Sequence, residues 1–206
     1  MDIDIDVYLG LGSNLGDKEG NLLKAVSLID SEIEGLKVIA VSSVYITSPV
    51  GGEDQPDFLN CAVLCRYYYN AKKAGHNLSD SDLLNLLFKL KSIERLIGRI
   101  PEEKRWGARV IDIDMLLLFE AESGKKIVIN LPDLKIPHAE LKNRLFVLLP
   151  LLELNADMTC PVTGKSLKDV SDKLADKFVK TENGASQKIG LYGRFNESLT
   201  EITKIF

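Results

Sequence analysis

The chain has 206 residues, of which 45% are hydrophobic and 27% are charged. This is the composition of an ordinary globular protein, and it excludes a disordered chain, a collagen-like repeat and a small scaffold stabilised by disulfides. The 26 basic and 30 acidic side chains give a net charge of −4. Nothing in this balance predicts nucleic acid or an anionic membrane as a partner.

Three local features predict a cytoplasmic protein. The chain has three cysteines, an odd number without CxxC spacing: Cys61, Cys65 and Cys160. This favours buried thiols in a reducing compartment. The first six residues lack the basic and apolar regions of a signal peptide. The apolar run at 145–152 is interrupted by Pro150 and is far shorter than the ~20 residues of a membrane span.

Hydrophobic periodicity predicts the main elements of the first 119 residues. They are a strand at 7–9, a helix over 17–35, strands over 37–45 and 58–69, a helix that begins after Ser79 or Ser81, and a strand over 110–119. A glycine-rich turn is expected after the first strand, and a polar connection over 70–79. The order β-α-β-β-α-β is typical of a ferredoxin-like α+β protein, with helices on one face of an antiparallel sheet.

The rest of the chain is less strongly patterned. We expect a short strand near 127–129, a short helix at 143–149 and a helix over 168–178. Residues 181–206 are polar and weakly patterned. The sequence therefore predicts one domain over 1–178 and a small C-terminal extension over 179–206, an appendage and not a second domain.

Two carboxylates are predicted to share one face of the strand at 110–119. Because side chains alternate along a strand, Asp112 and Asp114 point to the same side. The other side is then one apolar face made of Ile111, Ile113, Met115, Leu117 and Phe119. Paired carboxylates need a cation, and two Mg²⁺ ions with a polyphosphate would satisfy them. The alternatives are a solvated face or salt bridges to Arg or Lys.

Basic residues surround this strand in the sequence. Arg99, Arg105 and Arg109 precede or begin it, and His138 and Arg144 follow. Cations beside an acidic pair suit an anionic ligand that carries metal. For Arg99 and Arg105, a solvated loop is the alternative interpretation.

The segment RWGARVIDIDML, residues 105–116, resembles the signature of the 6-hydroxymethyl-7,8-dihydropterin pyrophosphokinase family of folate biosynthesis. Further segments resemble the same family in the same order, at residues 9–16, 43–51, 54–60, 136–138 and 142–146. The resemblance runs from about residue 7 to 174. It implies a ferredoxin-like fold and transfer of diphosphate from ATP to the hydroxymethyl group of the pterin, with release of AMP.

The resemblance also implies roles for individual residues. Two Mg²⁺ ions would be bound by Asp112 and Asp114, and these two residues would be catalytic together with Arg99 and Arg109. Contacts with ATP are implied for Glu94, Arg99, Arg105, Arg109, His138 and Arg144. Contacts with the pterin are implied for Thr47, Val50, Phe58, Asn60, Trp106 and Phe146, with the two phenylalanines stacked on its two faces. Pro101 and Glu102 depart from the family, in which basic residues are expected there.

Two other functions fit part of the pattern. Nucleotidyl transferases also combine Gly-Ser with Asp-x-Asp, but here Gly12-Ser13 lies about a hundred residues before Asp112. A ferredoxin-like RNA-binding module is disfavoured by the negative net charge. The glycines at 10, 12 and 16 miss the spacing of the dinucleotide-binding fingerprint. We therefore expect an enzyme that acts on small molecules and has no nucleic-acid or membrane partner. We expect it to be a monomer or a weak homodimer.

Overall fold

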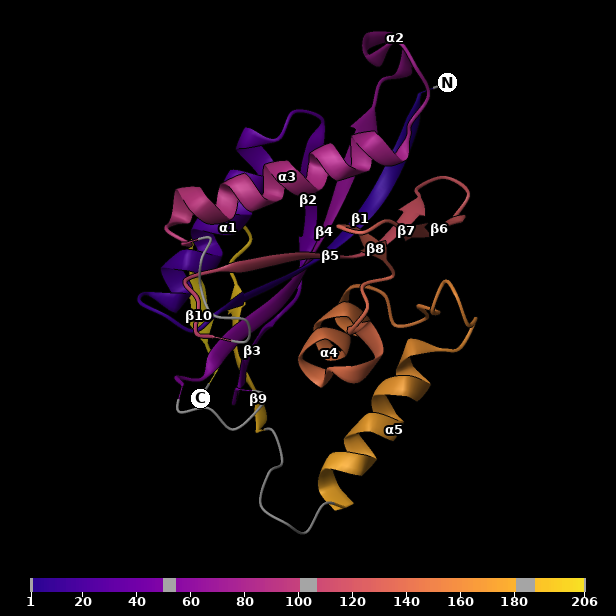
Figure 1. Ribbon diagram of the computed structural model, residues 1–206. Helices are drawn as coiled ribbons and strands as arrows, with labels where there is room; N and C mark the ends of the chain where they lie inside the picture. Colours follow the sequence, from indigo (N-terminus) through magenta and orange to yellow (C-terminus); the bar gives the residue numbers. More distant parts are fainter. Residues whose placement is uncertain (1, 50–54, 101–106, 181–187, 206) are drawn as a thin grey trace.

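The computed structural model describes residues 2–49, 55–100, 107–180 and 188–205 (Figure 1). The strands are β1 Ile3–Ser13, β2 Leu36–Val41, β3 Val44–Thr47, β4 Phe58–Tyr69, β5 Asp112–Glu120, β6 Lys126–Ile127, β7 Ile129–Asn130, β8 Lys135–Ile136, β9 Ile189–Phe195 and β10 Ile202–Lys204. The helices are α1 Lys18–Glu32, α2 Ala71–Ala74, α3 Asp80–Ile97, α4 Leu145–Leu154 and α5 Leu167–Lys180, with a 3₁₀ turn, η1, at Leu141–Asn143.

Eight of the described strands form one antiparallel sheet. Its order is β10-β9-β3-β4-β1-β5-β6, and β2 pairs with the same strand β4 that β3 pairs with. Strands β7 and β8 form a separate two-stranded ribbon. The predicted ferredoxin-like α+β class is confirmed.

Helices cover both faces of the sheet (Figure 1), whereas helices on one face only were predicted. On one face, α1 and α3 pack on residues such as Val7 and Leu9 of β1, as predicted. On the other face, Tyr8 and Ala62 pack with Leu148 of α4, and α5 lies against α4. The second layer is needed because β1 and β4 carry apolar side chains on both faces, and both must be removed from water.

Capping fixes the starts of the two long helices. The side chain of Asp17 accepts from the Gly20 amide at 3.0 Å and ends the turn before α1. At α3, the Ser79 amide donates to the Asp82 carboxylate at 2.9 Å in a capping box. Ser79, and not Ser81, is therefore the N-cap.

The first two predicted strands differ from the prediction in extent. The first continues through the glycines to Ser13, because β4 and β5 pair with that segment on either side. The segment at 37–45 is broken at residues 42–43 into β2 and β3. There the Ser42 hydroxyl oxygen replaces a backbone carbonyl as acceptor: the Ala62 amide donates a hydrogen bond to it at 2.9 Å.

Strand β5 contains a bulge that interrupts its alternation. Leu117 lies opposite Tyr8, whereas Met115 lies opposite Leu9, so Leu116 is an extra residue. One extra residue reverses the faces beyond it. The predicted unbroken apolar face is therefore wrong after Met115: Leu117 and Phe119 pack on the α4 side, where Phe119 meets the ring of Tyr8 at 5.8 Å between centroids.

The C-terminal extension adds to the sheet. Strand β9 pairs with β3, and β10 returns alongside β9. The sequence analysis did not predict this hairpin, in which Ile202 is buried and Tyr192 and Phe195 pack against the core. Helix α5 continues to Lys180, two residues beyond the predicted end at 178.

Helix α4 runs through Pro150, which the sequence analysis treated as an interruption. Proline has no N–H to donate to the carbonyl of Phe146, but Leu148, Pro150 and Leu151 are buried and hold the helix in place. None of the helices in the described part of the chain is long and apolar enough to span a membrane.

The three cysteines are free and buried, as predicted. Burial raises the pKa of the Cys61 thiol to about 12, so this side chain behaves as a small apolar group and not as a nucleophile.

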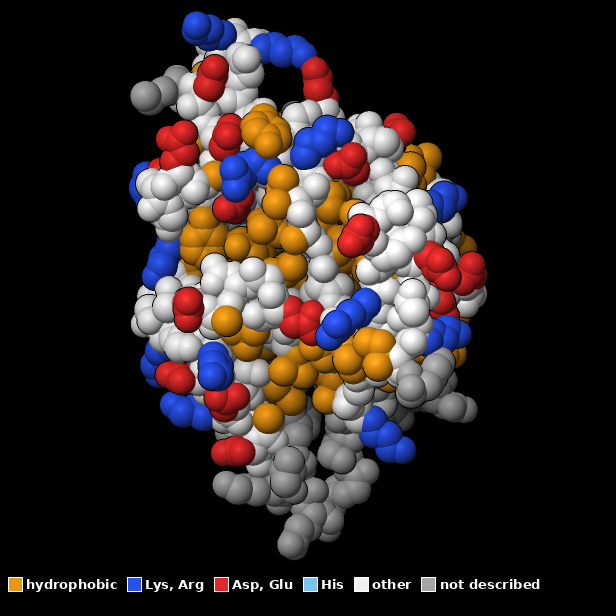
Figure 2. All heavy atoms as spheres, turned by 180° about the vertical axis from the view of Figure 1, so that it is seen from behind, with side chains coloured by type: hydrophobic (Ala, Val, Ile, Leu, Met, Phe, Trp, Pro, Cys, Tyr) orange, Lys and Arg blue, Asp and Glu red, His pale blue; other side chains and the backbone are white. Residues whose placement is uncertain are grey.

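Charges of both signs are intermingled on the face of the molecule shown in Figure 2. Apolar side chains gather near its middle. This face therefore offers no extended basic surface of the kind that binds nucleic acid.

Truncation of a side chain on α3 is expected to destabilise the protein only where that side chain is buried in the core. Leu90→Ala should lower the free energy of unfolding by about 2–5 kcal/mol, because Leu90 is fully buried. Leu96→Ala on the same helix is the control, since Leu96 is 62% exposed, and should cost less than about 0.5 kcal/mol. Urea unfolding measures both; equal losses would contradict the assigned orientation of α3.

Candidate functional site

A cavity of about 540 Å³ opens on the α4 side of the sheet. Its floor is formed by β1, β4 and β5, and its walls by the segments at 47–49 and 138–147. Ten of the predicted site residues line it: Thr47, Phe58, Asn60, Arg99, Arg109, Asp112, Asp114, His138, Arg144 and Phe146. Val50, Arg105 and Trp106, as well as Pro101 and Glu102, lie outside the described residues.

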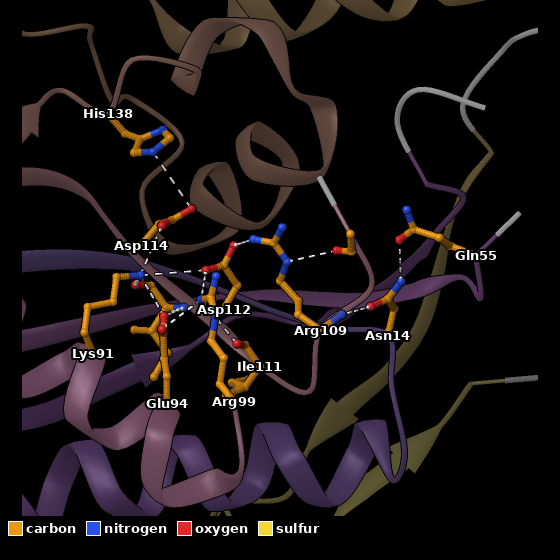
Figure 3. A network of polar contacts seen from close by, with 12 residues as sticks. Asn14, Gln55, Lys91, Glu94, Arg99, Arg109, Ile111, Asp112, Asp114 and His138 are labelled. Carbon is orange, nitrogen blue, oxygen red and sulfur yellow. Dashed lines mark hydrogen bonds and ion pairs between the residues drawn. The ribbon is translucent and has the colours of Figure 1, made fainter. Parts of the chain in front are cut away.

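Asp112 is surrounded by cationic side chains (Figure 3). Arg109 Nη1 donates to its Oδ2 atom at 2.7 Å, Arg99 donates to its Oδ1 atom, and Lys91 Nζ lies 3.7 Å from Oδ1. Burial would raise the pKa of the Asp112 carboxyl, but Lys91, Arg99 and Arg109 outweigh burial and lower it to about 2. Asp112 is therefore ionised at neutral pH.

Asp114 lies on the same face and is held more loosely. Its Oδ1 atom is 3.6 Å from Lys91 Nζ, and its Oδ2 atom is 3.9 Å from His138 Nε2. Both separations exceed hydrogen-bond length. His138 itself is fixed by its backbone, whose amide donates to the Leu116 carbonyl at 2.9 Å.

Lys91 and Glu94 of α3 join the edge of β5. The Ile113 amide donates to Glu94 Oε1 at 2.6 Å, and Lys91 Nζ donates to the Ile113 carbonyl at 2.7 Å. These contacts satisfy backbone groups that an edge strand would otherwise leave to solvent or to another chain. Lys91 also donates to Glu94 at 2.7 Å.

Glu94 supports the site from behind. It does not line the cavity, is 3% exposed, and accepts from Arg99 Nη1 at 2.8 Å. Burial raises the pKa of its carboxyl, and Lys91 and Arg99 act against that rise. Glu94 therefore orients two of the cations that face Asp112.

Lys91 is a cavity residue that the sequence analysis missed. Its i,i+3 spacing from Glu94 was the available signal, but such pairs are common on solvent-exposed helix faces. Only the position of α3 beside β5 brings Lys91 to both aspartates. Burial would lower its pKa, but Asp114, Asp112 and Glu94 raise it overall, so Lys91 is charged.

Asn14 connects three segments beside Arg109 (Figure 3). Its Oδ1 atom accepts from the Arg109 amide at 2.7 Å, and its Nδ2 atom donates to Gln55 at 3.3 Å and to the Pro56 carbonyl at 3.1 Å. In the structure it fixes the backbone from which Arg109 reaches Asp112.

The opposite end of the cavity is aromatic and amide-lined. Asn60 Nδ2 donates to Thr47 Oγ1 at 2.8 Å, and both residues are buried. Phe58 and Phe146 line the cavity from β4 and α4, and the guanidinium carbon of Arg144 lies 5.6 Å from the centre of the Phe146 ring. A planar ligand with amide-like edges fits this combination.

Gly12 is required by the position of Asn60. A Cβ atom on Gly12 would lie 2.9 Å from Asn60 Oδ1, closer than non-bonded atoms approach. Gly12 therefore lets the Asn60 side chain approach the backbone of β1, within a strand and not in the predicted turn.

The charge of Asp112 is expected to stabilise the fold in magnesium-free buffer. Asp112→Asn should lower the free energy of unfolding by about 1–2 kcal/mol, because charge-assisted bonds to Arg99 and Arg109 are lost. Asp114→Asn is the matched control and should change it by less than about 0.5 kcal/mol, because its contacts are longer. Urea unfolding at pH 7 tests this; a more stable Asp112→Asn variant would contradict it.

Comparison with known proteins gives consistent relatives. Residues 8–156 match the model of a family described as 7,8-dihydro-6-hydroxymethylpterin-pyrophosphokinase (HPPK). A 2-amino-4-hydroxy-6-hydroxymethyldihydropteridine pyrophosphokinase of Aquifex aeolicus is 38% identical over 163 residues, which are 79% of this chain and 88% of that protein. The Bacillus subtilis protein of the same name is 41% identical over 147 residues, 71% of this chain and 76% of the relative.

Longer proteins match as well. "Folic acid synthesis protein fol1" of Schizosaccharomyces pombe is 33% identical over 95% of this chain, but the match covers only 24% of that protein. A crystal structure of Plasmodium falciparum HPPK-DHPS superimposes with a TM-score of 0.65 at 16% identity, over 100% of this chain and 50% of that one. The present chain thus spans about a quarter to a half of these relatives. Because the family model covers most of the chain and the shorter relatives align over most of their own length, the chain belongs to the HPPK family.

Proposed function

We propose that the protein transfers diphosphate from ATP to the hydroxymethyl group of 6-hydroxymethyl-7,8-dihydropterin, with release of AMP, as a step of folate biosynthesis. The observation that carries this proposal is one cavity with two chemically different ends. One end holds carboxylates and cations, and the other holds Asn60, Thr47 and two phenylalanines. Such a cavity can bring an anionic donor against a planar acceptor.

The cations are proposed to bind the phosphates of ATP. Lys91, Arg99 and Arg109 line the cavity beside Asp112, and His138 and Arg144 line it from the opposite wall. Guanidinium groups bind phosphate oxygens with the same paired geometry that they use for carboxylates, so Arg99 and Arg109 can exchange Asp112 for phosphate. Arg105 is proposed to join them, and Glu94 to act by holding Arg99 and Lys91.

Asp112 and Asp114 are proposed to hold two Mg²⁺ ions together with the phosphates. The donor set fits: Mg²⁺ prefers oxygen ligands and is commonly bound by one or two carboxylates plus substrate phosphates. The described residues contain no cluster of three or more His, Cys, Asp or Glu side chains that could hold a metal ion. When bound, such ions neutralise phosphate charge and activate an oxygen nucleophile.

The pterin is proposed to lie between Phe58 and Phe146. Its ring would stack on both phenyl groups, each contact adding ~0.5–1.5 kcal/mol beyond area burial. Asn60 offers both donor and acceptor atoms to the pterin edge. The Thr47 hydroxyl oxygen holds the Asn60 amide by accepting a hydrogen bond from its Nδ2 atom at 2.8 Å. Val50 and Trp106 are proposed to complete this end.

Catalysis is proposed to rest on positioning and charge. Phosphoryl transfer requires an in-line approach and stabilisation of charge more than covalent help from the protein. Arg109 would stabilise the charge that develops on the AMP oxygen, and Arg99 would hold the transferred group. The buried free thiols agree with a cytoplasmic location, and we propose a monomer or weak homodimer.

The direct test is incubation of the protein with ATP, Mg²⁺ and 6-hydroxymethyl-7,8-dihydropterin. The expected products are AMP and the pterin diphosphate, separated by anion-exchange chromatography. Pyrophosphate in place of AMP would indicate nucleotidyl transfer, and the absence of turnover would refute the proposal.

Asp114 is expected to be needed for turnover. Asp114→Asn should lower kcat by about a hundredfold or more, because an oxygen ligand with full negative charge is lost. The control is Asp133→Asn, which removes an exposed carboxylate away from the cavity and should leave kcat unchanged. Mg²⁺-dependent turnover near the wild-type value in Asp114→Asn would exclude it as a metal ligand.

Phe146 is expected to act in pterin binding. Phe146→Ala should raise the dissociation constant for the pterin about tenfold and leave that for ATP nearly unchanged, since the phenyl face is lost. Phe88→Ala, at a position that is 55% exposed, controls for loss of a phenyl group. Isothermal titration calorimetry measures both ligands, and unchanged pterin affinity would assign Phe146 to the core.

A further inference from the structure

The C-terminal hairpin, defined here as residues 188–204, lies beyond the residues that match the family model. It adds β9 and β10 to the edge of the sheet at β3. Nothing in the proposed reaction uses its side chains. Its contacts nevertheless lead directly to the pterin end of the cavity.

The first contact is a backbone tie at Ser48. The Ser48 amide donates to the Lys188 carbonyl at 2.9 Å, and the Lys188 amide donates to Ser48 Oγ at 2.8 Å. Ser48 lines the cavity together with its neighbours Thr47 and Pro49. The hairpin therefore holds the cavity wall at Ser48, the first residue after β3.

The second contact is the pairing of β3 on both edges. Thr47 lies opposite Ile189 of β9 on one side and opposite Phe58 of β4 on the other. A short strand such as β3, with four residues, is weakly ordered when only one edge is paired. The hairpin supplies the second edge.

The third contact pins the hairpin to α1. Tyr192 donates to the Glu19 carboxylate, and Lys204 Nζ lies 3.0 Å from the same group. The neighbouring Lys18 donates to the Asp57 carbonyl at 3.0 Å, directly before Phe58. The first turn of α1 thus connects the hairpin with the start of β4.

We propose that the C-terminal hairpin is a positioning element for the pterin, and that the Lys188 amide is its point of action on Ser48. This inference rests on the proposed function. The hairpin orders the wall at residues 47–49, so that binding the pterin costs less conformational entropy. Because β4 and β1 separate β3 from β5 in the sheet, the effect belongs to the pterin and not to the nucleotide end.

The test replaces the Lys188 amide. Lys188→Pro removes the N–H that donates to Ser48, since proline has none. Lys188→Ala is the matched control, because it removes the exposed side chain and keeps the amide. We expect Lys188→Pro to raise the KM for the pterin about fivefold, with kcat and the KM for ATP within about twofold of wild type, and Lys188→Ala to behave as wild type.

A second pair of variants, one disruptive and one control, tests the hairpin as a whole. A Cβ on Gly193 would lie 2.7 Å from the Thr203 carbonyl oxygen, whereas among the described residues a Cβ on Gly190 would meet Ile46 alone, at 3.7 Å. Gly193→Ala should raise the KM for the pterin and increase hydrogen exchange of the β3 amides, and Gly190→Ala should do neither. Thermal unfolding of each variant identifies any general loss of structure.

Three results would overturn the inference: identical kinetics in Lys188→Pro and Lys188→Ala, an equal rise in KM for both substrates, or faster exchange in β3 without a change in KM. Affinity for the pterin, measured by calorimetry with a non-hydrolysable ATP analogue, needs no turnover. If the wild type binds the pterin without releasing AMP, the proposed reaction fails, and weaker binding by Lys188→Pro still supports the inference.

Discussion

The structure of the site depends on how the charge of Asp112 is balanced. Its carboxylate receives bonds from two arginines that enter from separate segments, one after α3 and one before β5. Together with Asp112, three cations and two further carboxylates form one cluster: Lys91, Arg99, Arg109, Glu94 and Asp114. Such a cluster tolerates burial because its charges are paired. A triphosphate with two Mg²⁺ ions is itself close to neutral, so its binding would exchange partners within the cluster without adding net charge.

The same face of the sheet serves as cavity floor at one end and as core at the other. Gly10 and Gly12 of β1 line the cavity, and two residues earlier in the same strand Tyr8 packs with Leu148 of α4. The change follows from side-chain size along one strand. Glycine leaves room for ligand and for Asn60, while tyrosine fills the space and holds α4, which carries Phe146.

Local signals explain which features the sequence predicted. The bounds of β4 and the start of α3 after Ser79 or Ser81 follow from neighbouring residues, and the shared face of Asp112 and Asp114 follows from alternation. Contacts between distant segments could not be predicted in this way. Lys91 reaches β5 only because α3 packs beside it. The hairpin is joined to β3, a strand more than 140 residues earlier in the chain, and its few apolar side chains do not indicate that partner.

The extra residue at Leu116 lets the residues before it and the residues after it use different alternation along the same strand. Before it, alternation turns the two aspartates toward the cavity; after it, alternation restarts and places Leu117 and Phe119 beneath α4. Removal of one residue here would force a choice, either exposing aromatic surface on the wrong side or driving acidic groups into hydrocarbon. The number of residues between Asp114 and Leu117 is therefore constrained, because a change in that number would turn one of the two groups of side chains to the wrong face of the sheet.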